Sequence, residues 1–173
     1  MRNKKRWAWV VLLAGVLLAT TILPAAAKTT TTYVTGYCLF VEGPPATDVR
    51  VWYPGQNGIH MRTDILAVDC NYTDDRLDGV YLAEINWAVK AYSEPFFYFV
   101  GHDQGKLSLT AANGDLLWDG LRNSFFDELG GFSGTNIVHG HGIYAGLKAT
   151  LDMWGNLQDP GFFIAGTIID PGN

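Results

Sequence analysis

The feature that most restricts the fold of this sequence is the repeated alternation of short apolar runs with turn residues. Runs rich in aromatic and β-branched residues, such as 33–41, 79–89 and 161–169, are separated by turn-forming pairs such as Asn57-Gly58 and Asn113-Gly114. No stretch keeps a helical spacing of apolar residues over three turns. The pattern predicts an all-β fold, a single antiparallel β-barrel of about eight strands. Residues 122–136, "RNSFFDELGGFSGTN", are expected to form one long irregular loop.

The amino-terminal segment is expected to lie outside the folded domain. Four basic residues precede an apolar run that ends near Leu23, and three alanines follow at 25–27. This order is typical of a secretory signal peptide, and the run is short for a retained membrane span. We therefore predict a signal peptide at 1–27, a polar and poorly ordered spacer at 28–32, and a β-barrel domain at 33–173. The mature protein is expected to be secreted or periplasmic, with no membrane span.

Charge excludes one class of partner. Removing residues 1–27 takes away four of the 12 basic residues and none of the 17 acidic ones, so the net charge becomes −9. Such a chain repels nucleic acid, and no cluster of lysine or arginine remains to offset this locally. We expect no nucleic-acid partner, and the sequence leaves the oligomeric state open.

Cys38 and Cys70 are the only cysteines, and two cysteines in an exported chain predict one disulfide. In strand alternation Cys38 shares a face with Val34 and Phe40, and Cys70 shares one with Leu66 and Val68. Both sulfurs are therefore expected to point into apolar surroundings on neighbouring strands. Two buried free thiols are the alternative.

The stretch "NIVHGHGIYAGL" at 136–147 places His139 and His141 two residues apart on a predicted strand. Two imidazoles at this spacing can share a zinc ion if a third ligand joins them, and His60, His102 and Asp103 are the candidates. The surrounding glycines can be explained without a metal site, because glycine in a strand marks a tight bend or a close backbone approach. We predict no metal site and no cofactor, and we expect both imidazoles to lie more than ~5 Å from any group that completes a zinc shell.

Candidate ligand-binding residues come from a polar cluster and from the tryptophans. His60, Arg62 and Asp64 would share a face with Leu66 and, if that face is inward, would lie at one mouth of an apolar cavity. Arg62 would then orient a carboxylate ligand through two hydrogen bonds. The alternatives are an Arg–Asp pair at the barrel end and a bulge that turns the cluster outward. The candidate lining residues of the cavity are Trp52, Trp87, Trp118 and Trp154.

Several short motifs resemble those of a known group of barrels. They are an Asn-Gly-Asp hairpin at 113–115, a glycine-aromatic signature at 140–147, a closing Gly-Thr-Ile at 166–168, and an Asp-Arg-x-x-Gly turn at 75–79. In these the chain resembles secreted bacterial β-barrels related to the allene oxide cyclase barrel, a fold shared in outline with plant dirigent proteins. The resemblance covers most of residues 33–170 and implies an eight-stranded barrel with an apolar interior. It transfers no catalytic residue, because no position matches the cyclase active site.

Three functional interpretations follow. The first is an exported barrel that binds an apolar or amphiphilic small molecule in its interior. The second is an isomerase or cyclase-like enzyme that uses an interior polar group, and the third is a structural or surface protein whose barrel is filled by its own side chains. Whether the chain is an enzyme is left open. The interior volume is the observation that separates the first two interpretations from the third.

Overall fold

The computed structural model describes residues 28–92 and 98–172, and the predicted signal peptide therefore lies outside the described residues. These residues form one antiparallel sheet of nine strands with two short 3-10 helices, η1 (Asp75–Leu77) and η2 (Gly142–Tyr144). The strands are β1 (Thr30–Val41), β2 (Arg50–Trp52), β3 (Gly58–Tyr72), β4 (Gly79–Tyr92), β5 (Tyr98–Thr110), β6 (Leu116–Phe126), β7 (Gly131–Gly140), β8 (Lys148–Asn156) and β9 (Gly161–Asp170). Within the described ranges, no helix is both long and apolar enough to cross a membrane.

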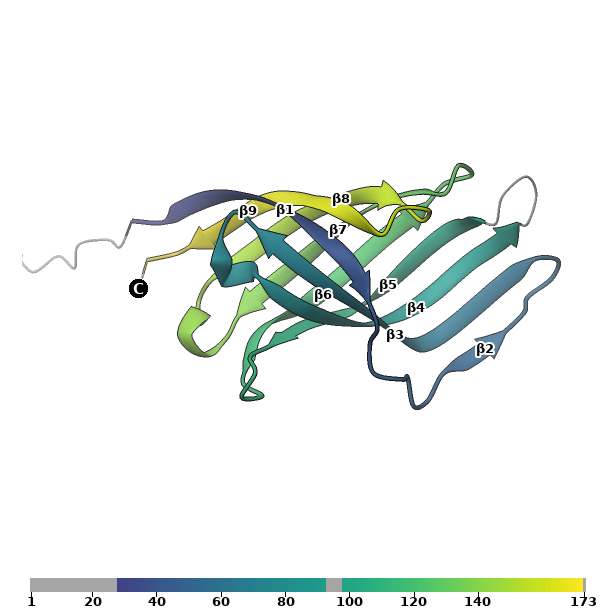
Figure 1. Cartoon of the computed structure of the whole chain (residues 1–173), viewed down its shortest axis with the longest axis horizontal. Coiled ribbons are helices and arrows are strands. Elements are labelled where there is room, and N and C mark those ends of the chain that lie inside the picture. Colours follow the sequence, from purple (N-terminus) through teal and green to yellow (C-terminus); the bar gives the residue numbers. More distant parts are fainter. Residues whose placement is uncertain (1–27, 93–97, 173) are drawn as a thin grey trace, which may run out of the picture.

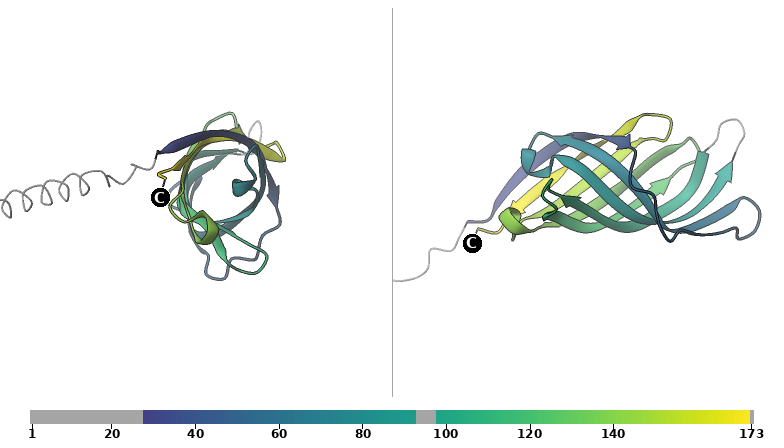
Figure 2. Two further views of the ribbon diagram at one scale, coloured as in Figure 1. Left: turned by 90° about the vertical axis from the view of Figure 1, so that its left-hand side faces the viewer. Right: turned by 60° about the horizontal axis from the view of Figure 1, so that its bottom comes forward.

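The sheet closes on itself through its first and third strands. β1 pairs with β9 along one edge and with β3 along the other, so eight strands form a ring (Figures 1 and 2). β2 pairs with β3 outside that ring. The predicted barrel is confirmed, and closure leaves its eight ring strands paired on both sides.

Strong staggering of the strands accompanies this closure. Successive directly paired residues lead from Tyr37 on β1 around the ring to His60 on β3. On the other side of β1, however, Tyr37 is paired with Asn71, which lies eleven positions after His60 on β3. One of these eleven positions is the extra residue of a β-bulge. A stagger of this size requires strands that are strongly tilted to the barrel axis, by about 35–45° in closed barrels.

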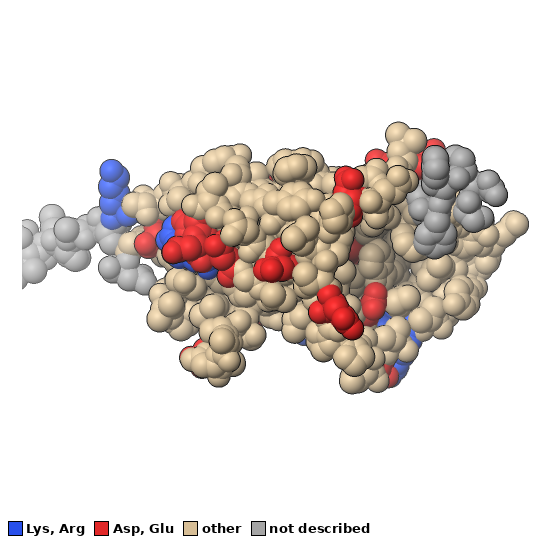
Figure 3. Space-filling model, viewed as in Figure 1, with Lys and Arg blue, Asp and Glu red and all other residues tan. Residues whose placement is uncertain are grey.

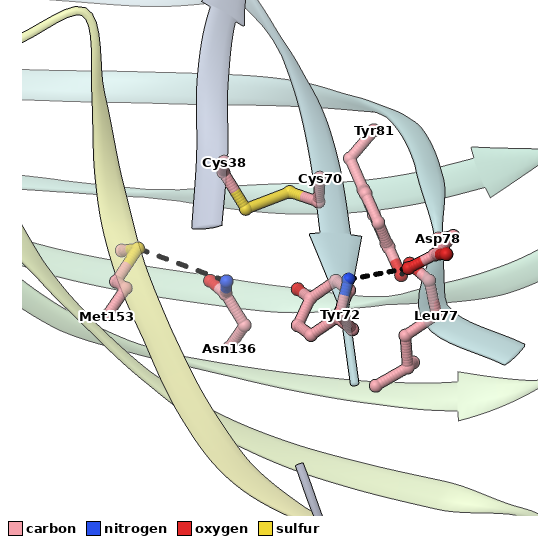
Figure 4. Close-up of a disulfide and its surroundings, with 8 residues drawn as sticks. All are labelled: Cys38, Cys70, Tyr72, Leu77, Asp78, Tyr81, Asn136 and Met153. Carbon is pink, nitrogen blue, oxygen red and sulfur yellow. Dashed lines mark hydrogen bonds between the residues drawn. A yellow bond between two sulfur atoms is a disulfide. The ribbon is translucent and has the colours of Figure 1, made fainter. Parts of the chain in front are cut away.

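The Cys38–Cys70 disulfide joins the two strands whose pairing closes the ring. The two cysteines are direct partners in the β1–β3 register, and both are buried inside the barrel (Figure 4). The predicted disulfide is confirmed. Its two ends are 32 residues apart in sequence, so in the chain-entropy model it stabilises the fold by roughly 3–4 kcal/mol.

One end of the barrel is closed by η1. In the view along the barrel, η1 lies within the ring of strands (Figure 2, left). Leu77 is fully buried there, the Tyr81 hydroxyl donates to the Leu77 carbonyl at 2.8 Å, and Trp118 Nε1 donates to the Arg76 carbonyl at 2.7 Å. Burial raises the pKa of Tyr81 well above its ordinary range. Burial, and then the charge of Asp78, does the same for Tyr72.

The outer end of η1 is charged. Asp74 accepts two hydrogen bonds from the Arg76 guanidinium, at 2.8 and 2.6 Å, and these hydrogen bonds lower the pKa of the Asp74 carboxyl. On the face drawn in Figure 3, one cluster of charged side chains lies at this end, and separate acidic and basic groups are spread toward the other end among uncharged side chains. The wall is therefore dominated by uncharged side chains on that face.

The opposite end of the interior is filled by aromatic rings from six strands. Trp87 stacks on Phe126 at 5.2 Å between ring centroids, and Phe132 meets Phe162 edge to face at 5.5 Å. Phe40 and Phe99 complete the set, with ring distances of 5.5 Å to Phe162 and 6.1 Å to Trp87. Together with the η1 plug, these rings show that the inward-facing side chains pack against one another through much of the barrel length.

Two expectations about irregular segments are wrong. Residues 122–136 are not a loop but the hairpin of β6 and β7, in which Asp127 Oδ1 accepts the backbone N–H groups of Leu129 and Gly131 to close the turn. Thr30–Thr32, expected to be a disordered spacer, belong to β1 and pair with Ile168–Asp170. In 122–136 cross-strand pairing gives order to a sequence interrupted by glycines and polar residues, whereas the β-branched Thr30–Thr32 suit a strand by their own propensity.

Candidate functional site

A β-bulge in β3 decides where the predicted polar cluster lies. Between Met61 and Asp64 this strand has one residue more than β4, and Thr63 has a positive φ of 60°. The extra residue reverses the alternation, so His60 and Arg62 face outward while Asp64 faces inward. The prediction that all three residues share one face is wrong for this reason.

Asp64 turns its carboxylate away from Arg62. Its Oδ2 accepts the indole N–H of Trp87 at 2.9 Å, and its Oδ1 accepts the backbone N–H of Ile65 at 3.0 Å. In the described part of the chain, no carboxylate oxygen lies within 4.0 Å of the Arg62 guanidinium. Arg62 is therefore an exposed cation without a charged partner among these residues.

The outward side of the bulge contains a hollow of about 280 Å³. Three of the five predicted ligand-binding residues, Trp52, Arg62 and Trp87, are among its lining residues, which also include His60, Met61, Asn86, Ala88, His102 and Gln104. No aspartate or glutamate is found among these described lining residues. We call this hollow the bulge site.

The contacts within the bulge site hold the Arg62 guanidinium in an orientation suited to binding a planar anion. Its guanidinium carbon lies 5.4 Å from the centroid of the Trp52 ring, and Trp52 meets His60 edge to face at 5.2 Å. Stacking on an aromatic face restrains the guanidinium while its N–H groups stay available. A guanidinium presents paired donors that match the two oxygens of a carboxylate.

The other two predicted residues lie elsewhere. Trp118 is fully buried at the η1 end, where it stacks on Tyr144 at 5.7 Å between ring centroids. Trp154 lies on the outer wall, 46% exposed, and stacks on Phe163 at 6.2 Å. The structure therefore does not bring the tryptophans together as the lining of one interior cavity.

An ion pair inside the barrel was missed by the sequence reasoning. Arg122 is 6% exposed and donates to the fully buried Asp103 through two hydrogen bonds of 3.2 and 3.0 Å, and to Ser124 Oγ at 3.2 Å. Alternation from the apolar Leu107 and Leu109 places Asp103 inward and could have revealed it. Each charged group thus has the other as its partner in the interior.

Asn136 is the direct cross-strand partner of Arg122 and also points inward. Its amide nitrogen lies 3.9 Å from the sulfur of Met153, and its Oδ1 has no hydrogen-bond partner among the described residues (Figure 4). The middle of the barrel is thus polar, between the aromatic end and the η1 plug. Among the described residues, hollows of about 280 to 520 Å³ open on the outer wall and beside the β6–β7 turn.

The two histidines of "VHGHG" do not share a strand. β7 ends at Gly140, packed against the Tyr144 carbonyl with no room for a Cβ atom, and His141 begins η2. His141 Nε2 lies 2.7 Å from Asp119 Oδ1, so the expectation of a separation above ~5 Å is wrong for this residue. Within the described ranges, no three His, Cys, Asp or Glu side chains form a group suited to a metal.

Comparison with known proteins adds no relative to this picture. Neither a family model, nor a curated protein, nor a solved structure matches the chain.

Proposed function

We propose that this protein is an exported binding protein whose bulge site takes a small organic anion with a flat apolar face. The observation that carries the proposal is Arg62, stacked on Trp52 beside a hollow with no Asp or Glu among its described lining residues. A carboxylate of the ligand would pair with the guanidinium, and its apolar face would cover the tryptophan. The site thus lies on the outer wall and not in the interior that the sequence favoured.

Backbone strain supports a role for the bulge beyond packing. A positive φ at a β-branched residue such as Thr63 costs of order 1–3 kcal/mol and persists where the surrounding structure imposes it. Here the strained residue adjoins Arg62 and reverses the direction of His60 and Arg62. Strained backbone of this kind concentrates at ligand sites.

A filled interior agrees with binding on the outer wall. The packing of the aromatic end and the mutual pairing of Asp103 and Arg122 support the interpretation of a solid barrel that presents a site on its surface. Export of the chain is a proposal, and the pattern of residues 1–27 and the disulfide support it. The relationship to allene oxide cyclase-like barrels is a proposal that rests on the short motifs alone.

The test is calorimetric titration with two carboxylates, benzoate and glucuronate, each compared with its neutral partner, benzyl alcohol or glucose. We expect at least one carboxylate to bind and its neutral partner to bind more weakly. Arg62→Gln should weaken that binding by about 1.5 to 3 kcal/mol. The matched control is Lys148→Gln, since Lys148 is exposed on β8 and does not line the bulge site. Absence of binding by both carboxylates, or equal losses in the two variants, would refute the proposal.

A further inference from the structure

The bulge site lies at one end of a row of aromatic side chains that crosses the outer wall. On β1, β9, β8, β7 and β6 the row consists of Tyr37, Phe163, Trp154, Ser133 and Phe125, each the direct partner of the next. Tyr37 meets Phe163 at 5.1 Å and Trp154 stacks on Phe163 at 6.2 Å. Three of these rings, Phe163, Trp154 and Phe125, are 55%, 46% and 58% exposed.

The row continues without a break into the bulge site. Phe125 is paired with His102, His102 with Ala88, Ala88 with His60, and His60 with Trp52. Their rings also meet, at 6.3 Å for His102 and Phe125 and at 5.2 Å for Trp52 and His60. We call the nine residues from Tyr37 to Trp52 the ring row.

A second row, of polar side chains, runs beside the ring row two residues away on each strand. Asp152, Thr135, Asn123, Gln104 and Asn86 are direct partners in this order. Thr135 Oγ1 donates to Asp152 Oδ1 at 2.8 Å, and the other three side chains are exposed. We call these five residues the amide row, and Arg62 lies beyond its Asn86 end.

Two small residues in the ring row leave hollows between the rings. Ser133 lies between Phe125 and Trp154 beside a hollow of about 410 Å³, which Asn123, Thr135 and Asp152 also line. Ala88 lies between His102 and His60 in the bulge site. The two hollows therefore repeat one arrangement: a ring on each side, a small residue beneath, and amide or hydroxyl groups along one edge.

This arrangement matches the chemistry of a sugar chain. A pyranose presents a face of C–H groups, which an aromatic ring covers, and a rim of hydroxyls, which need both donors and acceptors. Amide and hydroxyl side chains supply both. Neighbouring strands lie ~4.8 Å apart, about the length of one sugar unit in an extended chain, so a chain laid across the strands would place about one unit on each.

The charges along the two rows decide which sugar chain fits. Arg62, at the bulge site, is the only Lys or Arg among the described residues that line these two hollows, and Asp152 is the only Asp or Glu. Lys106 lines a third hollow, beside Asn86, Gln104, Asn123 and Thr135 of the amide row. A carboxylate on the sugar is therefore matched at the Arg62 end and a neutral unit at the Ser133 hollow. A nucleic acid chain, with a charge on every unit, would meet only Arg62, its neighbour Arg50 and Lys106 along the described rows of this acidic protein.

We propose that the outer wall binds an acidic oligosaccharide of about four or more units along the ring row and the amide row, with a sugar carboxylate on Arg62. The proposal rests on the proposed function of the bulge site and extends that site over β5, β6, β7 and β8. Trp154 and Phe125 would stack against the sugar units farthest from Arg62, and the side chains of the amide row would hydrogen-bond the sugar hydroxyls.

The experiment measures binding of β-1,4-linked oligomannuronates of one to six units, with cello-oligosaccharides of equal length as the neutral series. The acidic affinity should rise by about tenfold or more between one and four units and should exceed the neutral affinity at each length. Trp154→Ala and Phe125→Ala should each lower tetramer affinity by about tenfold and leave monomer affinity unchanged, whereas Arg62→Gln should lower both. Tyr33→Ala is the matched control, because Tyr33 is an exposed aromatic residue of β1 outside the ring row.

The outcomes separate this inference from the proposed function. If benzoate or the mannuronate monomer binds through Arg62 but affinity does not rise with length, or Trp154→Ala leaves the tetramer unaffected, the extended site is overturned and the bulge site stands. If tetramer binding depends on Trp154 but not on Arg62, the acidic assignment and the proposed function both fail. Light scattering of the free protein is the last check, since a dimer that Trp154→Ala dissociates would assign the ring row to a second copy of the chain and overturn the proposal.

Discussion

Replacing Arg122 by methionine tests how the polar middle of the barrel contributes to stability. Asp103 is fully buried, and Arg122 makes both of the side-chain hydrogen bonds described for its carboxylate. Truncating one partner of a buried pair leaves the other charge without compensation, which costs about 3–5 kcal/mol. Since domains of this size are stable by about 5–15 kcal/mol, Arg122→Met should remove a large part of the free energy of unfolding.

The double variant separates the contribution of the ion pair to stability from the cost of leaving one buried charge without a partner. Asp103→Leu combined with Arg122→Met leaves no charge to bury, so it should unfold at higher urea than either single variant. Urea unfolding followed by circular dichroism measures all three, with Arg50→Met as control, because the Asp48–Arg50 pair is exposed and should add almost nothing. A loss below about 1 kcal/mol for Arg122→Met, or a double variant no more stable than the worse single one, would contradict the buried-pair argument.

Three further predictions concern titration and backbone strain. The pKa values of Tyr72 and Tyr81 are higher in the folded protein than in the unfolded chain, so the free energy of unfolding is unaffected by the ionisation of these groups below pH about 10 and falls as pH rises above it. Ultraviolet titration should therefore find both phenols ionising only as the protein unfolds. The pKa of Asp74 is lower in the folded protein, so its contribution to the free energy of unfolding is complete above pH about 4 and is lost as pH falls through the folded-state pKa. Asp74→Asn should lower the free energy of unfolding by about 1 kcal/mol at neutral pH and make it depend less on pH in acid, as measured by urea unfolding at several pH values. Thr63→Gly should raise the free energy of unfolding by about 1 kcal/mol, since glycine adopts a positive φ without strain, and a loss would show that the bulge is not strained.

The barrel and its disulfide were predictable because both depend on local alternation. The two cysteines lie on strands whose inward positions are marked by Val34 and Val68, so their facing follows from the sequence. The β6–β7 hairpin was hidden for the opposite reason. Its inward positions include Gly134, packed against Ser124 and Met153 without room for a Cβ, and a strand with glycine at such a position resembles a loop when read alone.

The bulge at Thr63 limited the prediction of the site. One extra residue exchanges the two faces of a strand, and nothing in "HMRTDILAV" marks where it occurs. Trp52 and Arg62, predicted for an interior cavity, lie together at a hollow on the outer wall, whereas Trp87 borders that hollow but turns its ring into the barrel, where it stacks on Phe126. That these residues bind a ligand stays a prediction, and their direction depends on a register that only the paired strands define.

The ring row depends on register even more strongly, because its neighbours in space are separated by up to 126 positions in sequence, from Tyr37 to Phe163. A weak signal was nevertheless present in single strands. Asn123 and Phe125, and likewise Asp152 and Trp154, place a polar group and a ring two residues apart on the solvent side of a strand, where a folding core requires neither. One such pair on an exposed strand has little meaning. Its recurrence in aligned register on neighbouring strands is expected of a surface selected to meet a ligand that is itself repetitive, and this is the physical basis for preferring a chain of sugars over a single small molecule.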